Sequence, residues 1–447
     1  MTNIKTKGNI QQKAKTILNA DHVDHVEVVN NYYTDDKSSN KIFNKILTSE
    51  LIYLLKTEQG EQRFPQNLSF INTDNWLNEN ENQNIQDAQS YIGECFVWVI
   101  GEELRRLFVI GSNKDNDKVK IDNFIRQCIR IYRDSLQLIN YLFISTLWDE
   151  KIKHRNINTD KPNINNFFNT SKELKLEKLR NLLQELIETF RENPELEFPL
   201  EKTDLRDIND FLKPDSKFSK ACVELEKFEI LLNQKKEKYG FDECDIAEIS
   251  LATILSTFVF LTNYQLVSIK RIEYEESRNT APRYIKDINI LKLPPFVSYE
   301  EKISENDAKK NLIHLLKYDN TPQLTYSIYI WKGKRFINLF PFLLDYNALT
   351  NDPGFQLYLY ECMPEKSRLS YFSINSEKYY YIDYKATEPK KDEIKDEKLI
   401  NKLQINIRKD LVVKQFEVAM NTLLNEKTHF EAYKPKGSAI STDALPF

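Results

Sequence analysis

The 447-residue sequence has few of the residues from which nucleotide-binding loops are built. It contains only nine glycines, and neither G-x-G-x-x-G nor G-x-x-x-x-G-K-[ST] occurs in it. Such loops need clustered glycines, because only glycine lets backbone amides approach phosphates closely. The sequence therefore argues against a nucleotide-driven motor and against a dinucleotide cofactor.

Cysteine and histidine are too scattered to build a metal site or a disulfide framework. No two of the five cysteines lie at the C-x-x-C spacing that is typical of zinc and redox sites. The segment Asp21-His22-Val23-Asp24-His25 places two histidines three residues apart, but no clear distal ligand accompanies them. We therefore predict no metal and no cofactor, and the cysteine usage fits a reducing, cytoplasmic compartment.

Long hydrophobic runs are also rare, and the two signs of charge nearly balance. The chain has 63 Lys and Arg residues against 67 Asp and Glu residues, and its net charge of −4 argues against bulk coating of nucleic acid. The uncharged run 249–269 is long enough to cross a membrane, but Asn263, Tyr264 and Gln265 interrupt it. We predict a buried helix to about residue 261, a turn and then a strand, with no membrane association.

The period of the hydrophobic pattern changes along the chain and predicts an α+β fold. Apolar residues recur at spacings of three and four over much of residues 41–192, as in amphipathic helices. From Tyr264 the period shifts toward two, which indicates a mainly antiparallel sheet over about 264–385, and a C-terminal helix follows at about 391–431. The predicted domains are a docking tail at 1–40, a helical domain at 41–192, a proline-interrupted linker at 193–216, an α+β domain at 217–433 and a flexible tail at 434–447.

Local patterns predict several individual elements. Thr170-x-x-Glu173 has the pattern of a capping box and predicts the start of a helix that ends near Glu192. Lys332-Gly333-Lys334 separates two strand patterns and predicts a hairpin. A short helix is predicted at about 304–317.

The predicted sheet is rich in aromatic side chains interleaved with cations. Exposed rings beside a cationic groove can stack on the bases of a single strand, although aromatics are also favoured in ordinary cross-strand packing. Single-stranded nucleic-acid binding, with single-stranded DNA as a partner, is therefore one alternative function. Its candidate residues are Tyr329, Trp331, Lys332, Lys334, Arg335, Tyr379 and Tyr381.

A second alternative is a metal-dependent nuclease. Asp383-Tyr384-Lys385 follows a predicted strand and resembles the D/E-x-K half of a restriction-type nuclease site, and Asp345 could supply a second acid. Such a site needs acids to hold a metal ion and a lysine to steady the phosphate. Ordinary surface alternation on a strand produces the same letters, so this pattern alone predicts no enzyme.

The last five residues, Asp443-Ala444-Leu445-Pro446-Phe447, resemble the docking tip of bacterial single-stranded-DNA-binding proteins. The resemblance implies that Phe447 enters an apolar pocket on a partner and that the terminal carboxylate meets a cation. Asp443, Leu445, Pro446 and Phe447 are therefore the predicted partner-docking residues. The implied partner is a DNA-maintenance protein that normally receives that tip.

Longer segments are similar to parts of bacterial conflict and antiphage-system proteins. The segments are QQKAKTILNADHVDHVEVVN, LRRLFVIG with IRQCIRIYRDSLQLINYLFISTLWD, and FLTNYQLVSIKRIEYEESRN. The resemblance implies an accessory role in antiviral defence, with the N-terminal segment as a docking element. We therefore expect a non-enzymatic sensor or adaptor with protein partners at both termini.

Overall fold

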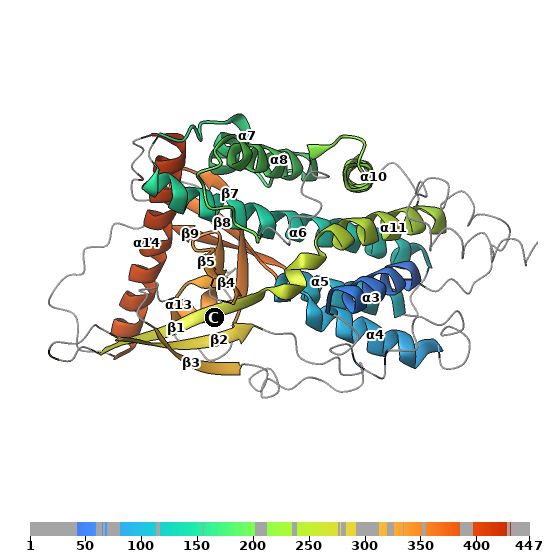
Figure 1. Cartoon of the computed structure of the whole chain (residues 1–447), viewed down its shortest axis with the longest axis horizontal. Helices are drawn as coiled ribbons and strands as arrows, with labels where there is room; N and C mark the ends of the chain where they lie inside the picture. The colour runs from blue at the N-terminus through green and yellow to red at the C-terminus, as the bar shows by residue number, and fades with distance from the viewer. Residues whose placement is uncertain are drawn as a thin grey trace, which may run out of the picture. The chain divides into compact units, whose positions relative to one another are not determined.

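The computed structural model confirms an α+β fold in which a helical N-terminal region precedes two antiparallel sheets and a C-terminal helix (Figure 1). The Cα atoms group into two compact units. The first holds the described residues up to Leu136 and those from Leu200 to Tyr264, and the second holds Gln137–Pro199 and the described residues from Gln265 onward. The structure describes residues 43–59, 65, 68, 81–112, 117–154, 156–201, 212–234, 239–275, 278, 283–291, 313–319, 326–333, 335–350, 355–384, 397–426 and 430.

The first unit consists of helices. Helix α11 packs against α3 and α10, and α4 packs against α3 and α5. Large aromatic side chains such as Phe108, Phe124 and Phe258 are fully buried in it. The elements are α3 (Lys45–Gln59), α4 (Glu81–Cys95), α5 (Trp98–Ser112), the first part of α6 (Asp117–Lys153), α10 (Lys217–Gln234), α11 (Phe241–Thr257) and the short 3₁₀ helix η2 (Val259–Asn263).

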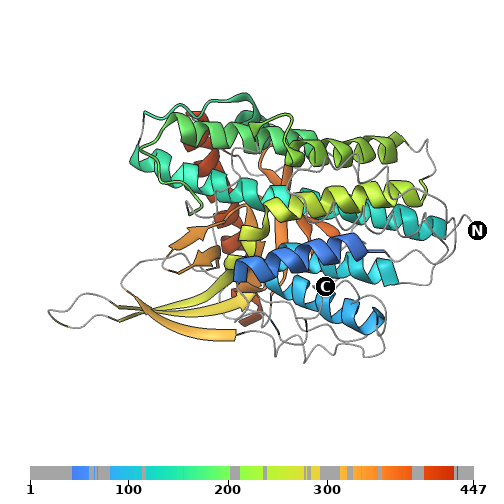
Figure 2. The ribbon, with the colours of Figure 1, turned by 45° about the vertical axis from the view of Figure 1, so that its right-hand side comes forward.

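The second unit contains both sheets. The five-stranded sheet has the order β3-β2-β1-β4-β5 and the four-stranded sheet has the order β6-β7-β8-β9, with antiparallel pairing throughout. In Figure 2 the yellow strands β1 and β2 form a long twisted ribbon with β3. The strands are β1 (Gln265–Glu275), β2 (Arg283–Leu291), β3 (Ile313–Asp319), β4 (Ile328–Lys332), β5 (Arg335–Asn338), β6 (Leu343–Asp345), β7 (Leu357–Glu365), β8 (Arg368–Ser373) and β9 (Lys378–Asp383).

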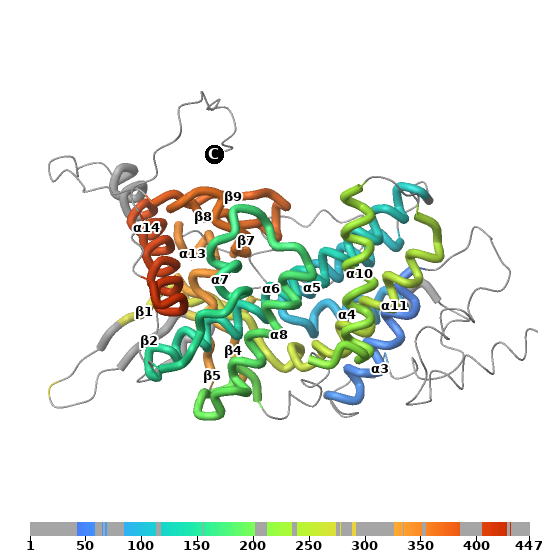
Figure 3. The backbone as a smooth tube through the Cα atoms, turned by 90° about the horizontal axis from the view of Figure 1, so that it is seen from above, coloured from blue at the N-terminus to red at the C-terminus, as the bar shows by residue number. Residues whose placement is uncertain are grey.

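Helices of the second unit pack on the four-stranded sheet. Helix α14 lies alongside that sheet and contacts β9, α7 and α13 (Figures 1 and 3). Phe416 of α14 packs on Tyr360 of β7, with ring centroids 4.7 Å apart. The helices of this unit are the second part of α6, α7 (Pro162–Asn169), α8 (Leu176–Glu192), α13 (Tyr346–Thr350) and α14 (Glu397–Leu424).

The uncharged run 249–269 divides as the sequence predicts. Helix α11 ends at Thr257, η2 covers Val259–Asn263, and β1 begins at Gln265. The predicted hairpin is confirmed as well, because β4 and β5 pair across Gly333, whose φ of +59° suits glycine. None of the helices that the structure describes is both long and apolar enough to cross a membrane.

Two local predictions are wrong. The helix predicted at 304–317 is contradicted from residue 313 onward, because Ile313–Asp319 is strand β3, paired with β2. Thr170 does not begin a helix; its backbone N–H closes α7 by donating to the carbonyl of Asn166 at 2.9 Å. Helix α8 begins later, at Leu176, without a side-chain cap. The domain boundaries predicted at 40, 192, 216 and 433 stay predictions.

Candidate functional site

Asp345, the first nuclease candidate, is fully buried at the end of β6. Its Oδ2 accepts hydrogen bonds from Ser268 Oγ and Lys270 Nζ, both at 2.7 Å. Its Oδ1 accepts from the backbone N–H groups of Asn347 and Gln356, at 3.1 and 3.2 Å. A carboxylate has about four acceptor positions, and protein donors occupy four here. Asp345 therefore joins the two sheets and caps α13, and it does not face an open metal site.

Asp383, the second candidate acid, lies far from Asp345 in the four-stranded sheet. Asp345 is on edge strand β6 opposite Leu357, whereas Asp383 is on the other edge strand, β9, opposite Arg368. Three strand spacings and about six residues along the strand separate them by roughly 25 Å, too far to share one metal ion. Lys385 lies outside the described residues. Among the described residues, no group of three or more His, Cys, Asp or Glu side chains could hold a metal ion.

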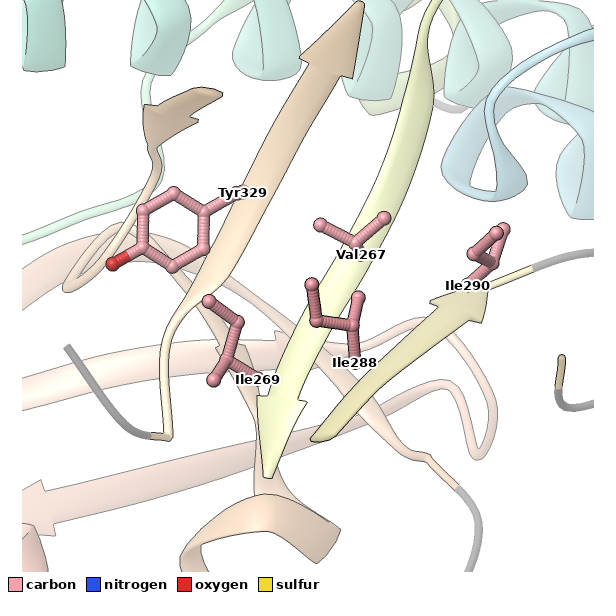
Figure 4. Close-up of a cluster of buried hydrophobic side chains, with 5 residues drawn as sticks. All are labelled: Val267, Ile269, Ile288, Ile290 and Tyr329. Carbon is pink, nitrogen blue, oxygen red and sulfur yellow. The ribbon is translucent and has the colours of Figure 1, made fainter. Parts of the chain in front are cut away.

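The hairpin residues predicted to bind nucleic acid are partly used in packing. Tyr329 is only 4% exposed and belongs to a buried cluster with Val267, Ile269, Ile288 and Ile290 (Figure 4). In the figure these five side chains come from the adjacent strands β1, β2 and β4. A ring in this position cannot stack on a base.

The other hairpin residues are half-buried and engaged with protein. Trp331 stacks on Phe336 with ring centroids 5.3 Å apart, and both pack against the buried cluster. Arg335 forms an ion pair with Glu197 at 2.9 Å and donates to the carbonyl of Phe198. Lys332 is half-buried, and Lys334 lies outside the described residues. The hairpin therefore resembles a packed edge more than a base-binding platform.

Strand β9 presents the exposed aromatics of the candidate set. Tyr379 and Tyr381 are 49% and 46% exposed, and their alternation places both rings on one face of an edge strand. The guanidinium of Arg368 lies 4.9 Å from the centroid of the Tyr381 ring. The Tyr379 hydroxyl donates to Glu173 Oε2 at 3.1 Å. Two exposed rings beside a cation form a small surface on which the bases of a single-stranded nucleic acid can stack.

Helix α14 carries a surface that the sequence analysis did not identify. One face, which includes Val412, Phe416, Met420 and Leu423, is buried as the 3–4 spacing predicts. Ile407, Leu411 and Val418 are nevertheless 52%, 42% and 46% exposed. At about 100° per residue, these three side chains fall within an arc of about 40° on the opposite side. We call Ile407, Leu411 and Val418 the outer stripe of α14.

A cation borders the outer stripe. Lys414 is exposed and lies about 20° beyond the edge of the stripe. Arg408 and Lys409 instead hold α14 in place. Arg408 lies 4.1 Å from the centroid of Tyr326 and donates to the carbonyl of Leu349 at 2.6 Å, and Lys409 lies 5.3 Å from the centroid of Tyr380. The stripe is thus an apolar surface with a cation at its side, fixed to the sheet by the opposite face of the helix.

The predicted docking tip, Asp443, Leu445, Pro446 and Phe447, lies outside the described residues. The predicted N-terminal docking element at 1–40 also lies outside them. No protein-family model, curated protein or solved structure matches this chain.

Proposed function

We propose that this chain is a non-enzymatic interaction protein, and that the outer stripe of α14 is the surface that binds its partner. The observation that carries the proposal is that α14 is apolar on two opposite sides, only one of which is covered. A surface helix normally has one apolar stripe, which faces the core, and polar residues on the opposite side. Isolated exposed apolar residues are ordinary, whereas these three lie along one side of the same helix.

The stripe fits the apolar face of an amphipathic helix that places a carboxylate opposite Lys414. Ile407 and Val418 are eleven residues apart, about 16 Å along the helix axis, which two to three turns of a partner helix would cover. Burying the exposed halves of three aliphatic side chains contributes on the order of 3 kcal/mol, or roughly 100-fold in affinity. A carboxylate opposite Lys414 would fix the position of the partner helix along the stripe. It would add little binding free energy, because the lysine is exposed.

The proposal includes an accessory role in antiviral defence. The resemblance of several segments to bacterial conflict and antiphage-system proteins supports this role.

The proposal also includes a second contact, in which the tip at 443–447 binds a DNA-maintenance protein. Deleting residues 445–447 should abolish capture of a protein that binds such tips and leave the melting temperature unchanged. A drop of several degrees would show that Phe447 is a core residue instead.

Co-purification with the products of adjacent genes tests the main proposal. The tagged chain is expressed with each neighbouring gene product, and wild type is compared with Ile407→Glu. Ile152→Glu is the matched control, because Ile152 is 57% exposed at the end of α6, outside the stripe. We expect a stoichiometric complex that Ile407→Glu abolishes and Ile152→Glu preserves. Complexes that both variants form equally well would remove the stripe from the proposal.

Single-stranded nucleic-acid binding is the second candidate, and the exposed pair Tyr379 and Tyr381 favours it. Loss of one stacking ring typically costs about 1–3 kcal/mol, so Tyr381→Ala should weaken binding of a fluorescent oligonucleotide roughly tenfold. Tyr53→Ala is the matched control, since Tyr53 of α3 is 62% exposed. Affinity measured at two salt concentrations should fall steeply with salt. An absence of binding at low salt would eliminate this candidate.

A further inference from the structure

Helices α5 and α6 of the first unit bring several buried charges together. Glu102 and Glu103 are almost completely buried on α5, and Asp134 is fully buried on α6. Burying charge is costly unless each ion is paired and hydrogen-bonded. Each of these carboxylates has an arginine partner: Glu102 accepts from Arg105 at 2.6 Å, Glu103 from Arg106 at 3.1 Å and Asp134 from Arg130 Nε at 3.0 Å.

Glu103 shares its arginine with the neighbouring buried carboxylate of Glu102. Its Oε1 accepts from Arg106 at 3.1 Å, but Arg106 also lies 3.3 Å from Glu102. Its Oε2 accepts from the neutral amide of Gln127, whose Nε2 lies 2.6 Å away and also donates to the Glu103 carbonyl at 2.9 Å. Glu103 therefore shares one guanidinium and relies on an amide for its second oxygen.

The charged and polar groups that shift the pKa of Glu103 come from α5 and α6, and some raise it while others lower it. Burial and the nearby charge of Asp134 raise the pKa of Glu103 to about 7, against the opposing effects of Arg106, Arg130 and the Gln127 hydrogen bond. Burial is the largest of these effects, because it disfavours the charged carboxylate. Burial beside Asp134 thus favours the protonated form of Glu103.

We propose that Glu103 is a proton-binding site that links the packing of α5 against α6 to pH in the neutral range. The folded unit binds this proton more tightly than the unfolded chain does. The resulting stability is complete below the pKa of an exposed glutamate and is lost as the pH rises through about 7. The loss corresponds to a change on the order of 100-fold in the unfolding equilibrium. This inference is independent of the stripe on α14.

The test compares wild type with Glu103→Gln between pH 5.5 and 8.5. Glutamine copies the neutral acid in size and can accept from Arg106 through its carbonyl oxygen, but its amide nitrogen cannot accept the Gln127 hydrogen bond at any pH. The lost hydrogen bond costs the same at every pH, so we expect the stability of the variant relative to wild type to be higher at pH 8.5 than at pH 5.5. Glu102→Gln is the matched control, because it removes an adjacent buried carboxylate that is paired with Arg105. It should lose stability at both pH values.

Infrared difference spectroscopy of the folded protein provides a second readout. Between pH 6 and pH 8, wild type should lose the carbonyl absorption of one protonated carboxylic acid. Glu103→Gln should lack that band, and Glu102→Gln should retain it. The proposal is overturned if Glu103→Gln changes stability equally at both ends of the pH range, or if its difference spectrum matches that of wild type.

Discussion

Lys270 and Asp345 form an ion pair that joins the two sheets of the second unit. Lys270 Nζ, on β1 of the five-stranded sheet, lies 2.7 Å from Asp345 Oδ2, on β6 of the four-stranded sheet. Asp345 is fully buried, and its other three contacts are also donors from the protein. Removing the Asp345 side chain would leave each of these four donors without its acceptor, so Asp345 contributes to the stability of both sheets.

Asp345→Ala should destabilise the second unit strongly. Removing one partner of a buried ion pair typically costs about 3–5 kcal/mol, because the other charge is left uncompensated. Urea denaturation of wild type and variant measures the difference. A loss below about 1 kcal/mol would contradict the structural role assigned to Asp345. A rise in the melting temperature with magnesium that depends on Asp345 would revive the nuclease interpretation.

Glu248→Gln should weaken the start of α3. Glu248 of α11 accepts hydrogen bonds from the backbone N–H groups of Asn44 and Leu47, at 3.2 and 3.0 Å, and so caps a helix about 200 residues away in sequence. Glutamine has one acceptor oxygen, so it leaves one buried amide unsatisfied at a cost of about 1–3 kcal/mol. Hydrogen exchange should show faster exchange in the first turn of α3. Unchanged exchange rates there would disprove the capping role.

Cysteine alkylation should single out Cys95. It is the half-buried cysteine, whereas the other four are buried in the structure. Burial and the Glu361 carboxylate also raise the pKa of Cys362 to about 11, which removes the reactive thiolate at ordinary pH. Mass spectrometry after iodoacetamide treatment at pH 8 should find Cys95 modified first and the others only after denaturation. Early modification of Cys362 would contradict its burial.

Much of the fold is predictable from the sequence because its elements follow local rules. The 249–269 run divides where Asn263 interrupts it, and the leucine pattern of α8 predicts the residues that are buried in it. The error at β3 has a physical cause. Ile313-His314-Leu315-Leu316 is too short an apolar run for periodicity to separate helix from strand. Pairing with β2, a tertiary contact, decides the outcome.

The candidate surfaces were harder to predict because they depend on which face of an element the rest of the fold covers. The aromatic pattern of the hairpin is real, yet Tyr329 faces the cluster of β1 and β2 side chains, whereas Tyr381 of β9 is exposed. The same residue type, tyrosine, is therefore part of the core at one position and exposed at another. The outer stripe of α14 cannot be recognised in the sequence, because the pattern does not show which of the apolar residues of a helix are buried and which are exposed.

Ile407→Glu should leave the stability of the protein unchanged. The side chain is 52% exposed, and surface substitutions of this kind usually change the unfolding free energy by less than about 0.5 kcal/mol. Thermal melting of the purified variant and of Ile152→Glu checks this directly. A large drop for Ile407→Glu alone would mean that the stripe is packed within the chain itself.

The most direct measurement of the proposed function is the affinity of the purified chain for each adjacent gene product and for itself, determined by biolayer interferometry. We predict that one of the gene products binds, that Ile407→Glu weakens its binding at least tenfold, and that Ile152→Glu changes it less than twofold. Self-association that Ile407→Glu weakens would mean that the stripe binds a second copy of this chain instead of a different partner. Binding that survives Ile407→Glu, or the absence of any binding, would contradict the role of the outer stripe.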